Sequence, residues 1–190
     1  MDNTKKTLDT SIFVNGDIIT FRDAKVNLKP MSWVEWAIRL LTKKPVNHAA
    51  TFRWIDGKLY VDEMLGDGSE SNIVNPRLLG EQVRISRCPY SKNKAEEIVY
   101  EIGCEKRAIE TSNRKYNYWG ILQQADEEIT GKSIVKIEAT PRPGEQLFCS
   151  ERAAYINLPF YPKWRDTVPG DLYSDTRNTI LFEGIVDKII

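Results

Sequence analysis

The dipeptide Asp56-Gly57 is a strong hairpin signal, because it separates two runs, 48–55 and 58–65, that are rich in β-branched, aromatic and other apolar residues. Asp and Gly tolerate the positive φ angles of a two-residue turn whose twist matches that of the flanking strands. The sequence therefore predicts a β-hairpin in which Ile55 lies opposite Lys58.

The register of this hairpin decides which polar side chains face one another. Counting back from the turn places Ala50 opposite Glu63. Because side chains alternate along a strand, His48 shares a face with Ala50, and Glu63 lies diagonally across from it, about 7–8 Å away between backbone positions. Asp62 points to the opposite face, although a one-residue bulge or a three-residue loop would exchange the two acids. The hairpin thus predicts that Glu63 can contact and orient the imidazole of His48.

The remaining elements are predicted from hydrophobic periodicity and turn residues. The 190 residues, 41% of them hydrophobic, suffice for one ordinary domain, so we predict a single α+β domain over residues 1–190. Expected helices are 32–41, 91–110, 116–129 and 149–157. The run 12–21 is broken by Asn15-Gly16 and is expected to form a strand that is entered through this turn and starts at Asp17. Other strands are expected at 82–87, at 179–183 and around Leu172, and 133–139 is either strand or loop. The apolar side of the helix 91–110 is expected to consist of Ala95, Ile98, Val99, Ile102 and Ile109.

The charge distribution narrows the classes of partner. Twenty-seven basic residues balance 27 acidic ones without a block of like charge, so we expect no nucleic-acid partner and no anionic membrane surface. The N-terminus lacks the apolar region of a signal peptide, and no apolar run is long enough to span a membrane. A cytoplasmic protein is therefore expected, although release by lysis or an unusual export route stays open.

The cysteines indicate neither a disulfide framework nor a metal site. Cys88, Cys104 and Cys149 are an odd number without CxxC spacing, which favours a reducing compartment. With one histidine and no paired cysteines, a zinc hydrolase would need an all-carboxylate site, which is uncommon for zinc. We expect no metal and no organic cofactor.

One histidine and one cysteine form the candidate catalytic pair. His48 is the only histidine, so a single imidazole must serve any acid–base chemistry. Cys149 lies where an extended stretch enters the helix predicted from residue 149, which is how a nucleophilic cysteine is usually presented. A thiolate beside an imidazolium at a helix N-terminus is strongly favoured over an ordinary thiol. The pair suggests a cysteine hydrolase in which Cys149 attacks and His48 holds the proton.

Further residues complete the candidate site. Glu63 would support the imidazolium and fix its tautomer. The backbone N–H of Cys149 and the side chain of Tyr116 would stabilise the oxyanion of the tetrahedral intermediate. Trp33 and Trp36 precede the histidine closely enough to line a substrate cleft. A lone histidine on an apolar strand and a free cysteine are each more often buried structural residues, so a non-catalytic binding module with the same fold is an alternative.

Six short motifs in a fixed order carry a resemblance to a known family. They are Gly16-Asp17-Ile18-Ile19, Asn47-His48-Ala49-Ala50, Val61-Asp62-Glu63 with Gly66, Tyr116-Asn117, Phe148-Cys149-Ser150-Glu151 and Pro169-Gly170-Asp171-Leu172. The histidine precedes the cysteine, which reverses the usual papain-like order. The chain therefore resembles the circularly permuted branch of the NlpC/P60 superfamily, and within it the YiiX-like proteins.

The resemblance implies a fold, a chemistry and two classes of substrate. The fold would be permuted papain-like, with a small antiparallel sheet or barrel packed against helices. Cys149 would be the nucleophile, His48 the base and Glu63 the third polar residue. Related enzymes are amidases or peptidases that act on cell-wall (peptidoglycan) peptides, and others transfer lipid acyl groups, so a thioesterase or acyltransferase on lipid or thioester substrates is the alternative. YiiX-like proteins are often exported, whereas this sequence shows no signal peptide.

Overall fold

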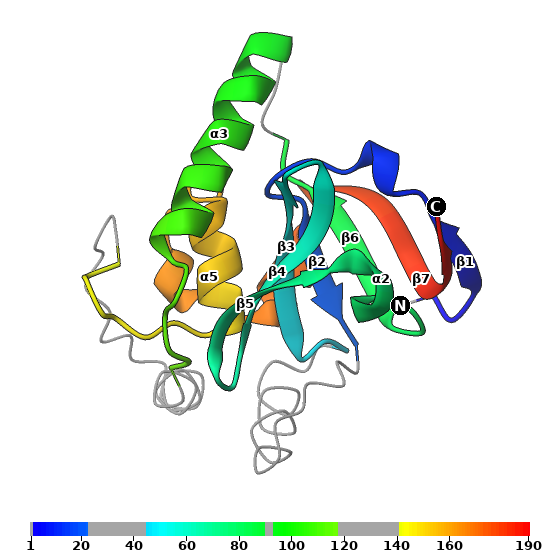
Figure 1. Cartoon of the computed structure of the whole chain (residues 1–190), viewed down its shortest axis with the longest axis horizontal. Coiled ribbons are helices and arrows are strands. Elements are labelled where there is room, and N and C mark those ends of the chain that lie inside the picture. The colour runs from blue at the N-terminus through cyan, green and yellow to red at the C-terminus, as the bar shows by residue number, and fades with distance from the viewer. Residues whose placement is uncertain (1, 23–44, 90–92, 118–140) are drawn as a thin grey trace.

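The structure is a computed structural model that describes residues 2–22, 45–89, 93–117 and 141–190. Within these residues one sheet contains seven strands, in the order β1-β7-β6-β2-β3-β4-β5 (Figure 1). The strands are β1 (Lys5–Leu8), β2 (Ile18–Phe21), β3 (His48–Ile55), β4 (Lys58–Leu65), β5 (Gly68–Ile73), β6 (Gln82–Arg87) and β7 (Thr179–Ile189). The helices are η1 (Thr10–Ile12), α2 (Val74–Arg77), α3 (Lys94–Glu110), α5 (Cys149–Ile156), η2 (Trp164–Asp166) and α6 (Pro169–Ser174). All neighbouring strands are antiparallel except β1 and β7.

The predicted hairpin is present in the predicted register. Asp56 and Gly57 have φ angles of 49° and 73°, as a two-residue turn with positive φ at both positions requires. Ile55 pairs with Lys58, and the ladder continues without a bulge until Ala50 pairs with Glu63. The absence of a bulge in this ladder keeps Glu63, and not Asp62, on the face of Ala50.

The sheet separates two apolar cores. On one face, Ile18, Ala49 and Met64 pack with the buried side chains of α5 and α3. On the other face, their neighbours along the strands, such as Ile19 and Ala50, pack with the buried residues of α2 and β6. Figure 1 shows α3 and α5 together beside β3, β4 and β5, while β7 and β1 form the far end of the sheet. The α+β class and the antiparallel sheet packed against helices are confirmed.

The predicted apolar side of the long helix is wrong. Within α3 the buried residues are Tyr100, Cys104 and Ala108, whereas Ile98, Val99, Ile102 and Ile109 are 49%, 70%, 60% and 55% exposed. The inward face carries small side chains because α3 lies close to its neighbours. A Cβ atom built on Gly16 would lie 2.6 Å from the sulfur of Cys104. A larger side chain in place of Cys104 would not fit against Gly16.

Other sequence-based predictions have mixed outcomes. The expected strand around Leu172 is wrong, because this residue is buried in α6, which begins at Pro169. The last strand extends beyond the predicted 179–183 to Ile189, and β1 and β5 were not predicted. Tyr116 belongs to an isolated bridge with Leu147 and not to a helix. The predicted helix 32–41, the segment 133–139 and most of the predicted helix 116–129 lie outside the described residues.

Candidate active site

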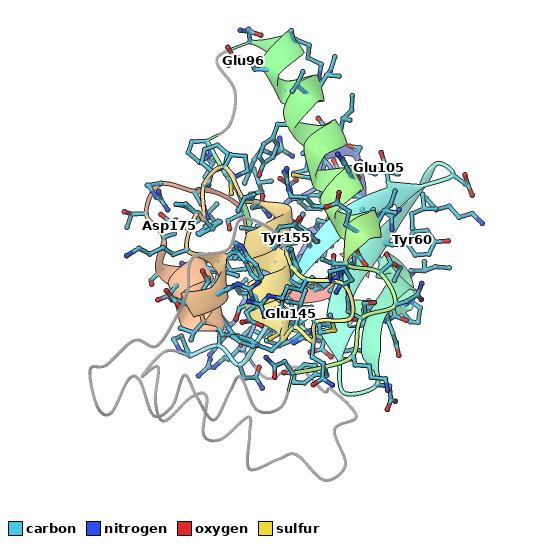
Figure 2. The ribbon with its side chains drawn as sticks, turned by 90° about the vertical axis from the view of Figure 1, so that its left-hand side faces the viewer. Tyr60, Glu96, Glu105, Glu145, Tyr155 and Asp175 are labelled. Atoms are coloured by element: carbon cyan, nitrogen blue, oxygen red, sulfur yellow. The ribbon has the colours of Figure 1, made fainter. Side chains whose placement is uncertain are left out.

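Cys149 is the first residue of α5, at the end of the helix where backbone N–H groups lack intrahelical partners. The helix start is held by Glu151, whose Oε2 accepts the backbone N–H of Phe148 at 3.1 Å. Burial raises the pKa of Glu151 well above its ordinary value. Figure 2 shows α5 in the centre of the helical layer, with Glu145 near the start of the helix and Tyr155 farther along it. The local sequence therefore presents the thiol at the positive end of the helix dipole.

The imidazole of His48 lies against this thiol. His48 is the first residue of β3, and Cys149 raises the pKa of its ring, so the imidazole and the thiol interact electrostatically. The backbone N–H groups of Ala49 and Ser150 also lower the pKa of this thiol. Burial alone would raise the pKa of Cys149, but the His48 imidazolium and these donors lower it below its ordinary value. The arrangement thus favours the thiolate.

Glu63 occupies the other side of the imidazole. Its Oε2 lies 2.9 Å from Nε2 of His48, so Nδ1 is the ring nitrogen left for Cys149. Burial alone would lower the pKa of His48, yet Cys149 and Glu63 raise it to about 9. The imidazole is therefore protonated at neutral pH, with one ring N–H toward each acidic partner.

Arg77 holds Glu63 from behind. Its Nε donates to Oε1 at 2.6 Å and its Nη2 donates to Oε2 at 2.8 Å, while Asn72 Nδ2 donates to Oε1 at 3.3 Å. Burial opposes ionisation of Glu63, but the bonds from His48 and Arg77 lower its pKa to about 2. The four side chains form a row of alternating charge: thiolate, imidazolium, carboxylate and guanidinium. Such a row stabilises charges that would each be costly to bury alone.

Arg77 was not predicted from the sequence as a residue of the site. The residue follows Glu63 by fourteen positions and lies on α2, which was not predicted. A short helical turn after β5 brings its guanidinium back to the end of β4. No motif or spacing in the sequence indicated this contact.

Asp62 lies on the opposite face of β4, as the hairpin register predicts. It accepts a hydrogen bond from Arg152 Nη2 at 2.8 Å and another from Ser71 Oγ at 3.0 Å. Asp62 and Arg152 form an ion pair with both side chains 2% exposed. Arg152 belongs to α5, so this pair ties the helix of the nucleophile to the hairpin. In the structure Glu63 alone of the two neighbouring acids contacts the imidazole.

Of the other predicted site residues, the structure describes Tyr116 but not Trp33 and Trp36. Tyr116 is buried, and its main chain is bridged to Leu147, two residues before the candidate nucleophile. Its neighbour Asn117 donates a backbone hydrogen bond to the Leu147 carbonyl at 2.9 Å. Tyr116 therefore lies beside the segment that leads into α5. Trp33 and Trp36 lie outside the described residues.

The described residues form neither a metal-binding cluster nor a membrane-spanning helix. Among residues 2–22, 45–89, 93–117 and 141–190, no group of three or more His, Cys, Asp or Glu side chains is placed to hold a metal ion. In the same part of the chain, no helix has the length and hydropathy that a membrane span needs.

Comparison with known proteins identifies the fold. No family model matches the chain, and no curated protein matches its sequence significantly. A solved structure does match: YiiX of Escherichia coli O157:H7, described as a metalloprotein. The match has a TM-score of 0.56 and 13% sequence identity, and it covers 90% of this chain and 97% of that one. The chain therefore has the fold of YiiX, which confirms the permuted papain-like fold that the sequence motifs implied.

Proposed function

We propose that the chain is a cysteine hydrolase that cleaves an amide bond through an acyl-enzyme. The observation that carries the proposal is the buried row of Cys149, His48 and Glu63 at the start of α5, in which Glu63 is hydrogen-bonded to His48 and His48 lowers the pKa of Cys149. Activated cysteines in hydrolases need a base within hydrogen-bond reach and a third group that orients the base. The YiiX-like fold supports a hydrolase of this kind.

The first half of the reaction uses the ion pair as it stands. The Cys149 thiolate attacks the carbonyl carbon, and the carbonyl electron pair moves to oxygen. The backbone N–H of Cys149 and the side chain of Tyr116 are the proposed donors to that oxyanion. As the tetrahedral intermediate collapses, the C–N bond breaks and His48 transfers the Nδ1 proton to the departing amine. The acyl group remains on sulfur as a thioester.

The second half regenerates the enzyme. Neutral His48 removes a proton from water, and the resulting hydroxide attacks the thioester carbonyl. Collapse breaks the C–S bond and releases a carboxylic acid, and the proton stays on His48 beside the restored thiolate. Glu63 accepts the Nε2–H bond throughout, so the imidazole keeps one tautomer when it is neutral.

The protonation state of His48 favours an amide over a thioester as substrate. An amine leaves an intermediate only when it is protonated, whereas a thiol leaves readily as an anion. An imidazole with a pKa of about 9 carries the needed proton at neutral pH. Peptides, including those of the cell wall, are the proposed substrate class, because the resembling enzymes act on them.

A metal is not part of the proposed mechanism, although YiiX is described as a metalloprotein. The site side chains with donor atoms are Cys149, His48 and Glu63. Both carboxylate oxygens of Glu63 already accept bonds from the Arg77 guanidinium, and Oε2 also lies against the imidazole. A divalent cation there would face a neighbouring positive charge and would have to displace these donors. The site does not fit a metal ion.

Alkylation of the three cysteines tests the proposal with internal controls. Burial raises the pKa of Cys88 to about 12 and that of Cys104 to about 11, so only Cys149 should react with iodoacetamide below pH 7. Peptide mass spectrometry would measure each site in the native chain and in the His48→Ala variant. The expected result is that Cys149 is labelled below pH 7 in the native chain but not in His48→Ala. Labelling of Cys149 only above about pH 8.5 in both proteins would overturn the ion pair.

A substrate comparison then tests the reaction. Cell-wall peptides and matched peptide thioesters would be offered to the native chain and to Cys149→Ala. The expected result is release of amine and acid from the peptides by the native chain alone. Turnover of thioesters without peptides would replace the proposed amidase by a thioesterase. A reactive Cys149 with no turnover of either would favour a binding module.

A further inference from the structure

The contact between Arg77 and Glu63 has the geometry of a clamp. Two parallel N–H···O bonds, of 2.6 and 2.8 Å, join the edge of the guanidinium to the two oxygens of the carboxylate. Such a fork fixes the plane of a carboxylate as well as its position. The carboxylate side chain is fully buried and the arginine side chain is 15% exposed, so solvent screens the pair weakly. The fixed plane is the one in which Oε2 also meets His48.

The guanidinium is itself held in place by an aromatic ring. The Cζ of Arg77 lies 4.6 Å from the ring centroid of Phe21, a cation–π distance. The ring of Phe21 lies 5.3 Å from the imidazole of His48 on the adjacent strand. One aromatic side chain on β2 therefore contacts both cations of the row, while Glu63 lies between them.

A clamp is needed because the carboxylate torsion of a glutamate is soft. The terminal torsion is broad and roughly two-fold, so a free carboxylate would point its oxygens in many directions. A lysine at the same position would supply the charge but not the two-pronged geometry. The direction of the Glu63–His48 bond in turn decides which way Nδ1 of His48 faces.

We propose that Arg77 is a positioning residue of the site, which holds the Glu63 carboxylate in the plane where it accepts Nε2–H of His48 and so aims Nδ1 at Cys149. The proposal deepens the hydrolase function and rests on it. Arg77 does not touch the reacting atoms and acts through Glu63 alone. The working unit is then a row of four residues, where the sequence motifs indicated three.

The charged neighbours of the row are few. Glu63 faces the two cations, His48 and Arg77, and Cys149 lies beyond His48. Nη1 of Arg77, which is not one of the two nitrogens that donate to Glu63, lies 3.8 Å from Oε1 of Glu81. The ion pair of Asp62 and Arg152 lies on the other face of β4. Loss of Arg77 therefore acts on the site mainly through Glu63.

The pair of Arg84 and Glu183 provides a control in which one arginine nitrogen, rather than a two-pronged fork, contacts the carboxylate. Arg84 donates from Nη2 to both oxygens of Glu183, at 3.1 and 2.9 Å, and its Cζ lies 3.9 Å from the ring centroid of Tyr173. Its side chain is 19% exposed, close to the 15% of Arg77. The two arginines thus have the same partners in kind, and only Arg77 contacts the candidate site.

The experiment uses the fact that the chain has one histidine, so its imidazole gives a single set of NMR signals. The native chain should show a downfield, slowly exchanging Nε2–H proton. In Arg77→Met this signal should disappear, and alkylation of Cys149 should begin at a higher pH than in the native chain, because the imidazolium is no longer aimed at the thiol. Arg77→Lys should keep the charge effect in part but not the sharp Nε2–H signal. Arg84→Met should leave both readouts unchanged.

The outcomes separate this inference from the hydrolase proposal. An Nε2–H signal and an alkylation profile that are the same in Arg77→Met and in the native chain would overturn the positioning role, whatever the activity. If the hydrolase proposal is right, kcat in Arg77→Met should fall about 100-fold with a smaller change in KM, as a misplaced catalytic group predicts. A native chain without turnover, whose His48 signals still respond to Arg77→Met, would refute the reaction but not the clamp.

Discussion

Glu63→Gln is the substitution whose effect on stability can be worked out most fully. Burial opposes the charge, but the bonds from His48 and Arg77 lower the pKa of Glu63 from 4.5 to about 2. A pKa lowered by folding contributes stability above the ordinary pKa and loses it as the pH falls through the folded value. One pH unit corresponds to about 1.4 kcal/mol, so the carboxylate contributes about 3 kcal/mol at pH 7. The same linkage leaves less than half of this contribution at pH 3.

Urea denaturation at the two pH values measures this contribution. Unfolding of native chain and variant can be followed by fluorescence of the five tryptophans. We expect Glu63→Gln to lower the free energy of unfolding by about 3 kcal/mol at pH 7, which corresponds to about 6–12 °C in Tm for a domain of this size. The difference should shrink by more than half at pH 3. A difference below about 1 kcal/mol at pH 7, or one of equal size at both pH values, would refute the reasoning.

Two further predictions concern the support of the site. Arg152→Met leaves Asp62 buried without its cation and should cost about 3–5 kcal/mol in urea denaturation. A cost below about 1 kcal/mol would contradict the importance of this buried pair. Gly16→Ala places a methyl group 2.6 Å from the Cys104 sulfur and should cost about 1–3 kcal/mol more than Gly80→Ala, which has a similar positive φ but open space. Equal melting temperatures of the two variants would contradict close packing there.

The hairpin and the contact across it were predictable because local chemistry determines both. Asp56-Gly57 sets the turn, the turn sets the register, and the register brings Glu63 beside His48. The start of α5 at Cys149 followed from an equally local signal, the end of an extended stretch. These features depend on residues within a few positions of one another or directly across one ladder.

The burial of α3 was not predictable from periodicity, because the helix carries two apolar faces. The sequence favours the face with Ile98, Val99 and Ile102, since those residues are the most hydrophobic. In the structure the opposite face is buried, and it is selected by small side chains and by Tyr100, whose hydroxyl donates to Asn157. Which face packs inward depends on neighbours from distant parts of the chain.

Arg77 was missed for a related reason. Its contact with Glu63 requires β5 to pair with β4 and α2 to turn back, and β5 is a polar strand without apolar alternation. Polar edge strands give a weak signal in a sequence. The contact between Arg77 and Glu63 can therefore be recognised only once the pairing of β5 with β4 is known.

The most direct test of the central claim is the NMR titration of the one imidazole in the native chain and in Cys149→Ala. Burial alone would lower the pKa of His48, but the thiolate and Glu63 raise it, so the native imidazole should titrate with a pKa of about 9. Removal of the thiolate should lower that pKa. A His48 pKa near the ordinary 6.5 that is the same in both proteins would contradict the Cys149–His48 ion pair and, with it, the proposed hydrolase.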